Sequence, residues 1–407
     1  MLNTPWQSAH LFELYENGEQ FFPAAFAAIA SARREVLLET FIWADDDVGR
    51  QLLATLVEAA RRGVGVDVCV DGYGSANITP AFVSELTAAG GRVHLFDPQP
   101  TVLGLRTNLV RRLHRKLLVV DGHRAFVGGI NFEVEQLVGH SPASKRDYAI
   151  AVVGPVVDEI RAFCRSFCSG APAAAPARRW WQRWTHRAEA SRSTPVPPGT
   201  HGMARFVCRD NRRHRTDIET LYRAWLRSAT REVILANAYF FPGYRLLREL
   251  RRAARRGVRV RLILQGRPDM KSAQLAAGSL YAYLVASGIE VYEYRERPLH
   301  AKVAVFDGRW ATVGSSNLDP LSLSLNLEAN LFVADRDLAQ ALRGRLCGII
   351  DAACERVPPE LARKPRWWWQ VYRILIFHLV RRFPQWARSM RARPQRLLTL
   401  SGRSDQD

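Results

Sequence analysis

The sequence predicts an α/β protein made of two related lobes, each a β-sheet flanked by helices and related to the other by a pseudo-two-fold axis. Two observations predict this fold. Strand-like apolar runs alternate with helical segments along the chain, which is typical of α/β proteins. Four sequence blocks of the first half also return in the same order in the second half, which indicates an internal duplication. With 407 residues, the chain is long enough for two lobes with separate cores.

The duplication is visible in pairs of matching segments. The first two pairs are SARREVLLETFI (31–42) with SATREVILANAY (228–239), and EAARRGVGVDVCVDG (58–72) with RAARRGVRVRLILQG (252–266). The other two are GGRVHLF (90–96) with SGIEVYEY (287–294), and LHRKLLVVDGHRAFVGGINF (113–132) with PLHAKVAVFDGRWATVGSSNLD (298–319). Because all four pairs occur in the same order in the two halves, chance similarity does not explain them.

Each half predicts the same run of elements. A helix ends near Arg34 or Arg231, and an apolar β-rich run follows it, VLLETFIW or VILANAYFF. A second helix ends at Arg-Arg-Gly, where basic residues in the last turn and a glycine just beyond it favour termination. Another β-run comes next. The predicted divisions are a first lobe at 10–170, a basic Trp-rich linker at 171–200, a second lobe at 201–355 and a basic Trp-rich tail at 356–407.

A His-x-Lys motif occurs once in each half, on a predicted strand that ends in an Asp-Gly turn. Its residues are His114, Lys116 and Asp121 in the first copy, and His300, Lys302 and Asp307 in the second. Residues two apart in a strand share a face, so the histidine and lysine of each copy point the same way and the aspartate points the other way. An aspartate before glycine commonly forms a hairpin turn. We expect that role for both aspartates, with a direct chemical role as the open alternative.

The return strand of each predicted hairpin suits an anionic ligand. Gly129 follows another glycine, and Ser315 occupies the same place in the second copy, so the backbone can approach a ligand closely. Asn131 and Asn317 add amide donors. Imidazole, ammonium, amide and backbone N–H groups together are typical of a site for a phosphate oxyanion.

Two histidines across a two-fold axis allow a division of labour near neutral pH. One, neutral, attacks phosphorus, and the other, protonated, gives its proton to the leaving oxygen. The two lysines neutralise negative charge in place of a metal ion. The second motif therefore supplies the other half of a single active site, and we expect neither a metal nor another cofactor.

The paired motif resembles the signature of the phospholipase D superfamily, H-x-K-x4-D-x6-G-S-x-N in duplicate, and the resemblance covers both lobes. It implies mixed-sheet lobes with the active site at their interface, and a metal-free, two-step transfer through a phosphohistidine. It also implies that His114 is the nucleophile and His300 the acid and base. One departure is Gly129, which replaces the usual serine and removes a hydroxyl donor from the first copy.

The same resemblance implies a carboxylate, one strand after each motif, that fixes the tautomer of the histidine. Glu328, in SLNLEANLFVAD, fits this place in the second half. The segment RDYAIAVVGP aligns with LEANLFVADR and puts Asp147 in the corresponding place of the first half. We therefore predict that Asp147 orients His114 and that Glu328 orients the second histidine. An ordinary acid at the edge of a strand is the alternative reading of both.

Within the superfamily, the sequence resembles the bacterial cardiolipin synthases, above all their shorter type B form. The features are GEQFFPAAFAAIASARREVLLETFIWADDDVGR, the LEANLFV block and the lack of N-terminal membrane helices. This implies transfer of a phosphatidyl group from one phosphatidylglycerol to the hydroxyl of another, with release of glycerol. A phospholipase D-type phospholipid hydrolase and a nucleic-acid phosphodiesterase stay open as alternatives. A membrane-binding scaffold without activity is disfavoured, because both motifs keep histidine and lysine.

The charge distribution favours a membrane as the partner. The net charge of +19 predicts an anionic partner, and thirteen basic residues fall in two Trp-rich segments without acidic residues, 178–187 and 361–394. The tryptophans that we assign to a membrane interface are Trp180, Trp181, Trp184, Trp367, Trp368 and Trp369. Tryptophan beside arginine is typical of a bilayer interface, whereas a nucleic-acid enzyme is expected to spread its charge along the catalytic groove.

The remaining features bear on location. The sequence starts without a secretory signal, has no run of about 18 apolar residues, and spaces its six cysteines as free thiols of a reducing compartment. We expect a peripheral enzyme on the cytoplasmic face of the inner membrane. Its expected partners are an anionic phospholipid membrane and the substrate phosphatidylglycerol. No nucleic acid is expected, and no protein partner is evident.

Overall fold

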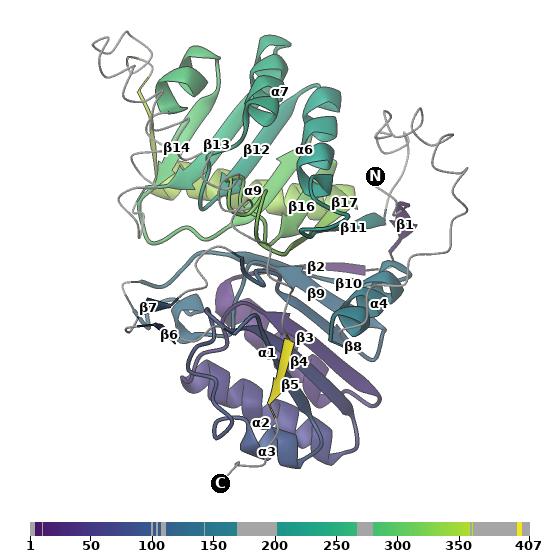
Figure 1. Ribbon diagram of the computed structural model, residues 1–407. Helices are drawn as coiled ribbons and strands as arrows, with labels where there is room; N and C mark the ends of the chain where they lie inside the picture. Colours follow the sequence, from purple (N-terminus) through teal and green to yellow (C-terminus); the bar gives the residue numbers. More distant parts are fainter. Residues whose placement is uncertain are drawn as a thin grey trace.

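Two α/β lobes lie one above the other in the computed structural model, with the first lobe below the second in Figure 1. The structure describes residues 5–9, 11–98, 101–102, 105–106, 111–141, 143–168, 202–266, 280–358, 360 and 397–400. The predicted class, an α/β protein of two related lobes that each contain a mixed sheet, is confirmed.

The first lobe is built on an eight-stranded mixed sheet. Its strands are β2 (Leu11–Glu16), β3 (Glu35–Thr40), β4 (Gly65–Asp71), β5 (Arg92–Phe96), β8 (Leu117–Val120), β9 (Arg124–Gly128), β10 (Tyr148–Val153) and β19 (Leu397–Leu400). They lie in the order β19-β5-β4-β3-β8-β9-β10-β2, with β3, β4 and β5 parallel and the other pairs antiparallel. Two short strands, β6 (Thr101–Val102) and β7 (Leu105–Arg106), form a separate ribbon.

The second lobe repeats this sheet. Its strands are β1 (Gln7–Ser8), β11 (Met203–Arg209), β12 (Glu232–Asn237), β13 (Arg259–Gln265), β14 (Glu290–Tyr294), β15 (Lys302–Phe306), β16 (Trp310–Gly314), β17 (Glu328–Ala334) and β18 (Cys354–Arg356). Their order is β1-β11-β17-β16-β15-β12-β13-β14-β18. Strands β12 to β17 correspond in order and pairing to β3, β4, β5, β8, β9 and β10, so the duplication read from the sequence is confirmed strand by strand.

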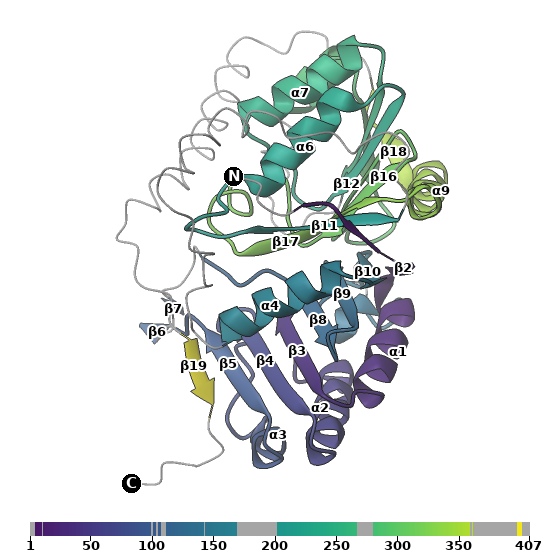
Figure 2. The ribbon, with the colours of Figure 1, turned by 90° about the vertical axis from the view of Figure 1, so that its right-hand side faces the viewer.

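Helices cover both sheets. They are α1 (Asn17–Ala30), α2 (Asp47–Arg61), α3 (Ser84–Ala88), α4 (Val156–Cys168), α6 (Asp217–Ser228), α7 (Tyr244–Arg255), α9 (Arg336–Ala353) and the short 3-10 helix η1 (Val134–Gln136). Figure 2 shows α1, α2 and α3 on the face of the first sheet that points away from the second lobe, with α4 on the opposite face. Among the described helices, none has the length and apolar character needed to cross a bilayer.

The lobes share a hydrophobic core. One apolar cluster combines inward-facing residues of both sheets with residues of α4 and α9, including Ile150, Ile160, Val303, Leu331 and Leu342, all fully buried. Helix α4 contacts β11 of the other sheet, and α9 contacts β2 of the other sheet. Separate clusters fill the outer layer of each lobe. A continuous apolar core between the sheets therefore holds the two halves of the chain in one arrangement.

Local sequence signals explain where α2 begins and where α2 and α7 end. The Asp46 side chain accepts a hydrogen bond from the Gly49 N–H at 2.9 Å and caps the start of α2. Gly63 and Gly257, the glycines of the two Arg-Arg-Gly sequences, follow α2 and α7 with φ of 84° and 89°. Such left-handed angles suit glycine, and they turn the chain into the next strand.

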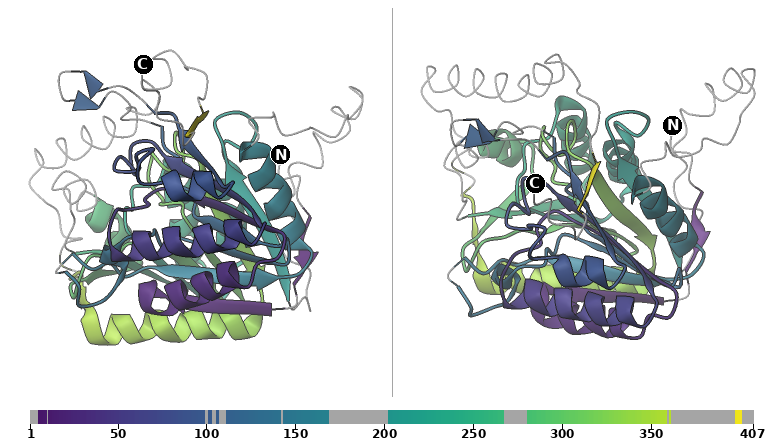
Figure 3. Two further views of the ribbon diagram at one scale, coloured as in Figure 1. Left: turned by 90° about the horizontal axis from the view of Figure 1, so that it is seen from below. Right: turned by 60° about the horizontal axis from the view of Figure 1, so that its bottom comes forward.

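Three edge strands lie at or beyond the predicted divisions of the chain. β1, which precedes the predicted first lobe, pairs with β11 of the second sheet. β18 continues the second sheet past residue 355, and β19 belongs to the first sheet, where it pairs with β5. Figure 3 shows β19, in yellow, at the end of the first sheet. The segment 397–400 was placed in the membrane-interface tail, and that placement is wrong, because its backbone completes a sheet edge.

Candidate active site

The first motif is fixed to the opposite lobe by its backbone. Leu113 and Leu327 form a parallel bridge between the lobes. The N–H of His114 donates to the carbonyl of Leu327 at 2.9 Å, and the N–H of Leu327 donates to the carbonyl of Arg112 at 2.8 Å. Because Leu327 immediately precedes Glu328, these bonds set the histidine beside a carboxylate that the other lobe supplies.

The second motif repeats this arrangement with the lobes exchanged. Arg146 and Leu299 form a parallel bridge. The N–H of His300 donates to the carbonyl of Arg146 at 2.8 Å, and the N–H of Arg146 donates to that of Pro298 at 2.8 Å. Arg146 precedes Asp147, so the pseudo-two-fold relation of the sequence is present in the backbone of the site.

The side chains complete two histidine–carboxylate pairs that cross between lobes. Nδ1 of His114 lies 3.0 Å from Oε2 of Glu328, and Nδ1 of His300 lies 2.6 Å from Oδ2 of Asp147. The prediction that each carboxylate orients the histidine of its own half is therefore wrong. Glu328 begins β17 and Asp147 directly precedes β10, the strands that follow their own hairpins, and the interlobe bridges bring these strand ends to the other lobe's histidine.

The imidazole rings of the two motif histidines lie next to each other at the lobe interface. Their ring centroids are 6.4 Å apart with an interplanar angle of 73°. Both Nδ1 atoms are engaged by carboxylates, which leaves each Nε2 for a ligand. A carboxylate on Nδ1 favours the tautomer with hydrogen on that atom, so a neutral ring keeps its Nε2 lone pair free to attack.

The two motif lysines are buried at the same interface. The ammonium of Lys116 donates to the carbonyl of His114 at 2.8 Å, and that of Lys302 donates to the carbonyl of His300. Lys302 Nζ also lies 3.8 Å from Oδ2 of Asp147. Their exposed fractions are 5% and 0%. A buried ammonium with few anionic partners is placed to receive a negative ligand.

Burial sets the proton affinity of the site. It lowers the pKa of His114 to about 4 and that of His300 well below its ordinary value. It also lowers the pKa of Lys116 to about 7 and that of Lys302 to about 8, with each lysine's neighbouring cations adding to the effect. Without a ligand, the site therefore disfavours positive charge. An incoming phosphate anion reverses this, because it stabilises every protonated group around it.

The two predicted amides differ in their surroundings. Asn131 accepts a hydrogen bond from the Ile42 N–H at 3.3 Å and donates to Glu133 at 3.4 Å. Asn317 is buried, and its Oδ1 has no hydrogen-bond partner among the described residues. A buried amide oxygen without a partner costs free energy, so Oδ1 of Asn317 can accept a hydrogen bond from a hydroxyl of a ligand.

The motif aspartates lie outside the site. Asp121 and Asp307 adopt left-handed conformations, with φ of 55° and 53°, in the hairpin turns. Asp121 accepts backbone N–H bonds from Arg33, Arg34 and Glu35. Asp307 accepts equivalent bonds from Thr230, Arg231 and Glu232. Each carboxylate thus ties its turn to the start of the neighbouring strand, which fits the expected turn role.

Two positioning residues escaped the sequence reasoning. Asp71 accepts a bond from the Leu113 N–H at 2.6 Å, and Gln265 accepts one from the Leu299 N–H at 2.9 Å. In both copies the donor directly precedes the histidine of the motif. The available signal was the polar residue before glycine at the end of each repeated strand, VDVCVDG and VRVRLILQG.

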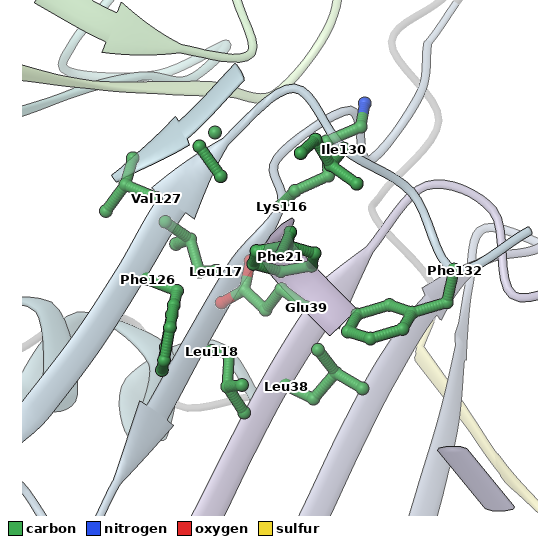
Figure 4. A pocket seen from close by; sticks show the side chains of 12 residues that line it. Phe21, Leu38, Glu39, Lys116, Leu117, Leu118, Phe126, Val127, Ile130 and Phe132 are labelled. Carbon is green, nitrogen blue, oxygen red and sulfur yellow. The ribbon is translucent and has the colours of Figure 1, made fainter. Parts of the chain in front are cut away.

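A small apolar cavity lies beneath Lys116 in the first lobe (Figure 4). It is lined by Phe21, Leu38, Glu39, Lys116, Leu117, Leu118, Phe126, Val127, Gly128, Ile130, Phe132 and Ala149. Lys116 extends along its rim, and its nitrogen points away from the apolar lining. The space has room for about one water molecule, so it is a gap in the core and not a site for an acyl chain.

The six predicted membrane-interface tryptophans lie outside the described residues. The six cysteines are free thiols. Within the described ranges, no group of three or more histidine, cysteine, aspartate or glutamate side chains is placed to hold a metal ion.

A duplicated α/β chain that brings two His-Lys pairs together at its lobe interface defines a protein of the phospholipase-D-like class. The family profile described as "Cardiolipin synthase, PLD-like domain" matches residues 26–156 and 222–347, which is more than half of the chain. The chain belongs to this family. It is 50% identical to cardiolipin synthase B of Escherichia coli K12 and 53% identical to that of Salmonella typhi. Each match covers 93% of this chain and 90% of the relative.

Solved structures agree on the fold. Phosphatidylserine synthase of Haemophilus influenzae Rd KW20 matches with a TM-score of 0.68 and 14% identity, covering 95% of this chain and 96% of that chain. Polyphosphate kinase of Porphyromonas gingivalis matches with a TM-score of 0.53 and 16% identity, covering 83% of this chain and 50% of that chain. At these identities the likeness concerns the fold alone.

Proposed function

We propose that this protein is a phosphatidyltransferase that makes cardiolipin from two molecules of phosphatidylglycerol and releases glycerol. The carrying observation is the crossed arrangement of two imidazoles, 6.4 Å apart, each backed by a carboxylate of the other lobe. Membership of the cardiolipin synthase, PLD-like family supports this choice of substrate over other phosphodiesters.

In the first half-reaction, neutral His114 attacks the phosphorus of phosphatidylglycerol through Nε2. A nitrogen–phosphorus bond forms, and the bond from phosphorus to the headgroup glycerol oxygen breaks. Protonated His300 gives its proton to that oxygen, so glycerol leaves neutral. Burial lowers the pKa of both histidines and so provides the neutral ring that a nucleophile needs, whereas the bound phosphate anion stabilises the protonated form of His300. The choice of His114 as the nucleophile follows the resemblance to the phospholipase D superfamily.

In the second half-reaction, the headgroup hydroxyl of another phosphatidylglycerol gives its proton to the now neutral His300. Its oxygen attacks phosphorus, the oxygen–phosphorus bond forms and the bond to His114 breaks. The buried ammonium groups of Lys116 and Lys302 offset the charge of the phosphate in both steps, and Oδ1 of Asn317 accepts a hydrogen bond from a headgroup hydroxyl. Glu328 and Asp147 hold the two rings in place.

The expected location is the cytoplasmic face of the inner membrane, with the two Trp- and Arg-rich segments, 178–187 and 361–394, on anionic lipid. Support comes from the described residues next to these segments. Cys168, before the first segment, and Leu397, after the second, pack in one apolar cluster with Leu113 and Leu327. Those two leucines precede His114 and Glu328, so the described residues on the chain side of each segment lie close to the site.

Labelled phosphatidylglycerol in vesicles tests the proposal directly. The purified protein is incubated with the vesicles, and lipid and water-soluble products are separated. We expect cardiolipin and free glycerol in equal amounts, and no product from His114→Ala. Phosphatidic acid without cardiolipin would identify a hydrolase, with water as the acceptor. Inert lipid together with cleavage of single-stranded DNA would identify a nuclease.

A further inference from the structure

The two orienting carboxylates are held by different local structures. Gly129 and Ser315 occupy equivalent positions, and their N–H groups donate to the carbonyls of Tyr148 and Ala329, each at 3.0 Å. Tyr148 and Ala329 directly follow the carboxylates Asp147 and Glu328. The backbone frames of the two pairs therefore match, while the side chains differ at both positions.

In the second lobe, a serine completes the frame. Ser315 Oγ accepts the Ala329 N–H at 3.0 Å and donates to Oε2 of Glu328 at 2.5 Å. The same Oε2 accepts the bond from Nδ1 of His114. The hydroxyl thus links a backbone donor to the carboxylate oxygen that orients the nucleophile.

In the first lobe, a carboxylate occupies the place of that serine. A Cβ added at Gly129 would lie 2.4 Å from both carboxylate oxygens of Asp147 and 2.7 Å from its Cγ. Oδ1 of Asp147 accepts the Tyr148 N–H directly, at 2.8 Å, which is the donor that corresponds to the Ala329 N–H. Oδ2 bonds His300. Aspartate has one CH₂ group fewer than glutamate, so the Asp147 carboxylate lies in the space that a side chain at position 129 would occupy.

We propose that Gly129 and Asp147 are a matched positioning pair that replaces the Ser315–Glu328 pair and presents a carboxylate oxygen to His300. The length of the acid at position 147 therefore decides which residue position 129 can hold. With aspartate at 147, its carboxylate fills the space of a side chain at 129, so this position must be glycine. A serine at 129 requires the longer glutamate at 147. The substitution that first looked like the loss of a phosphate donor serves the orientation of the second histidine.

The pair also makes the two sides of the site unequal. Burial raises the pKa of Asp147 to about 6, and no hydroxyl of the described residues donates to this carboxylate. Burial opposes ionisation of Glu328 as well, but His114, Lys116 and Ser315 outweigh it and hold the pKa of Glu328 below its ordinary value. The two carboxylates of the site thus differ in proton affinity as well as in packing, and the bearing of this difference on turnover rests on the proposed function.

The test is a double-mutant cycle with Gly129→Ser, Asp147→Glu and the combined variant. Each single change should lower kcat on phosphatidylglycerol roughly 100-fold, with KM within a few-fold, because His300 loses its orientation. The double variant should recover at least about tenfold over the worse single variant, because it rebuilds the second lobe's pair. The mirror cycle, Ser315→Gly with Glu328→Asp, is the matched control and should show the same rescue around His114.

A second readout needs no substrate. The downfield proton resonance of the His300 Nδ1–H, assigned with His300→Gln, should weaken or shift in each single variant and return in the double variant. Thermal unfolding identifies any variant that fails to fold. Additive losses in the cycle with no return of the resonance would overturn the pairing. If the wild type makes no cardiolipin, the resonance still tests the pair, so the two failures are distinguishable.

Discussion

Nδ1 of His114 and Oε2 of Glu328 lie 3.0 Å apart although 214 positions separate the two residues in the chain. The bond crosses from one lobe to the other, and its counterpart between His300 and Asp147 crosses in the opposite direction. Neither half of the duplication therefore contains a complete histidine–carboxylate pair. Both halves of the duplication are needed, because each half supplies the carboxylate that lies beside the histidine of the other half.

Glu328→Gln should lower kcat far more than it changes KM. The amide keeps the size of the side chain but removes the negative charge that fixes the tautomer of His114 and stabilises the positive ring formed when its nitrogen bonds phosphorus. We expect a loss of roughly 100- to 10,000-fold in kcat, as for the orienting carboxylate of other histidine sites. Glu355→Gln is the control, since its side chain is 71% exposed and pairs with Arg295 at the surface. Steady-state kinetics on mixed micelles measure both, and near-normal kcat for Glu328→Gln would refute the orienting role.

The sequence was sufficient for the features that repeat. The paired H-x-K-x4-D spacing predicted the hairpins of both motifs, and the Arg-Arg-Gly sequences predicted where α2 and α7 end. The sequence did not predict that each carboxylate contacts the histidine of the other lobe. Asp147 and Glu328 were recognised as a pair, but which histidine each contacts depends on how the two sheets pack, and periodicity along one chain carries no information on that.

The edge strands were missed for a related reason. Leu397–Leu400 is four residues long and lies beyond a basic segment, so composition assigned it to the tail. Its place beside β5 is determined by a free sheet edge that lies about 300 positions earlier in the chain. Asp71 and Gln265 were missed because their role depends on a hydrogen bond to a residue about 40 positions away.

The decline of kcat/KM with rising pH should begin at an unusually low pH for a site that depends on lysines. Binding of the phosphate needs protonated lysines, and burial lowers the pKa of Lys116 to about 7 and that of Lys302 to about 8. As pH rises through these values the lysine cations are lost, so kcat/KM should decline between about pH 7 and pH 8. Lys116→Arg keeps its charge and should remove part of the decline. A wild-type profile that stays level to about pH 10, where ordinary lysines titrate, would contradict this reading.

Asp307→Ala should reduce stability and spare the chemistry. The carboxylate accepts three backbone N–H bonds, and φ of 53° at this position is unfavourable for alanine. We expect the free energy of unfolding to fall by about 3 kcal/mol in urea titrations. Asp307→Asn keeps an acceptor and tolerates the left-handed angle, so it should cost about 1 kcal/mol. At low temperature kcat per folded molecule should be unchanged in both, whereas a loss of kcat in a folded variant would make this aspartate part of the chemistry.

The Trp- and Arg-rich segments should determine where the enzyme works. Replacing Trp367, Trp368 and Trp369 by alanine should weaken flotation with phosphatidylglycerol-containing vesicles by on the order of tenfold, because indoles anchor at the headgroup level. Replacing Trp180, Trp181 and Trp184 should act in the same direction, since Cys168 precedes that segment in the chain, Leu397 follows the other, and both residues pack in one cluster with Leu113 and Leu327 beside the site.

The charge of these segments gives the control for that experiment. Vesicles of neutral lipid should bind the wild type weakly, and high salt should release it from anionic vesicles, because thirteen basic residues in the two segments interact with the surface charge. Turnover of a short-chain, micellar phosphatidylglycerol should survive in both tryptophan variants, because the histidines and lysines are intact and this substrate needs no bilayer. Undiminished flotation of both variants would place the membrane-binding surface elsewhere on the protein, and loss of micellar turnover would place the tryptophans in the active site instead.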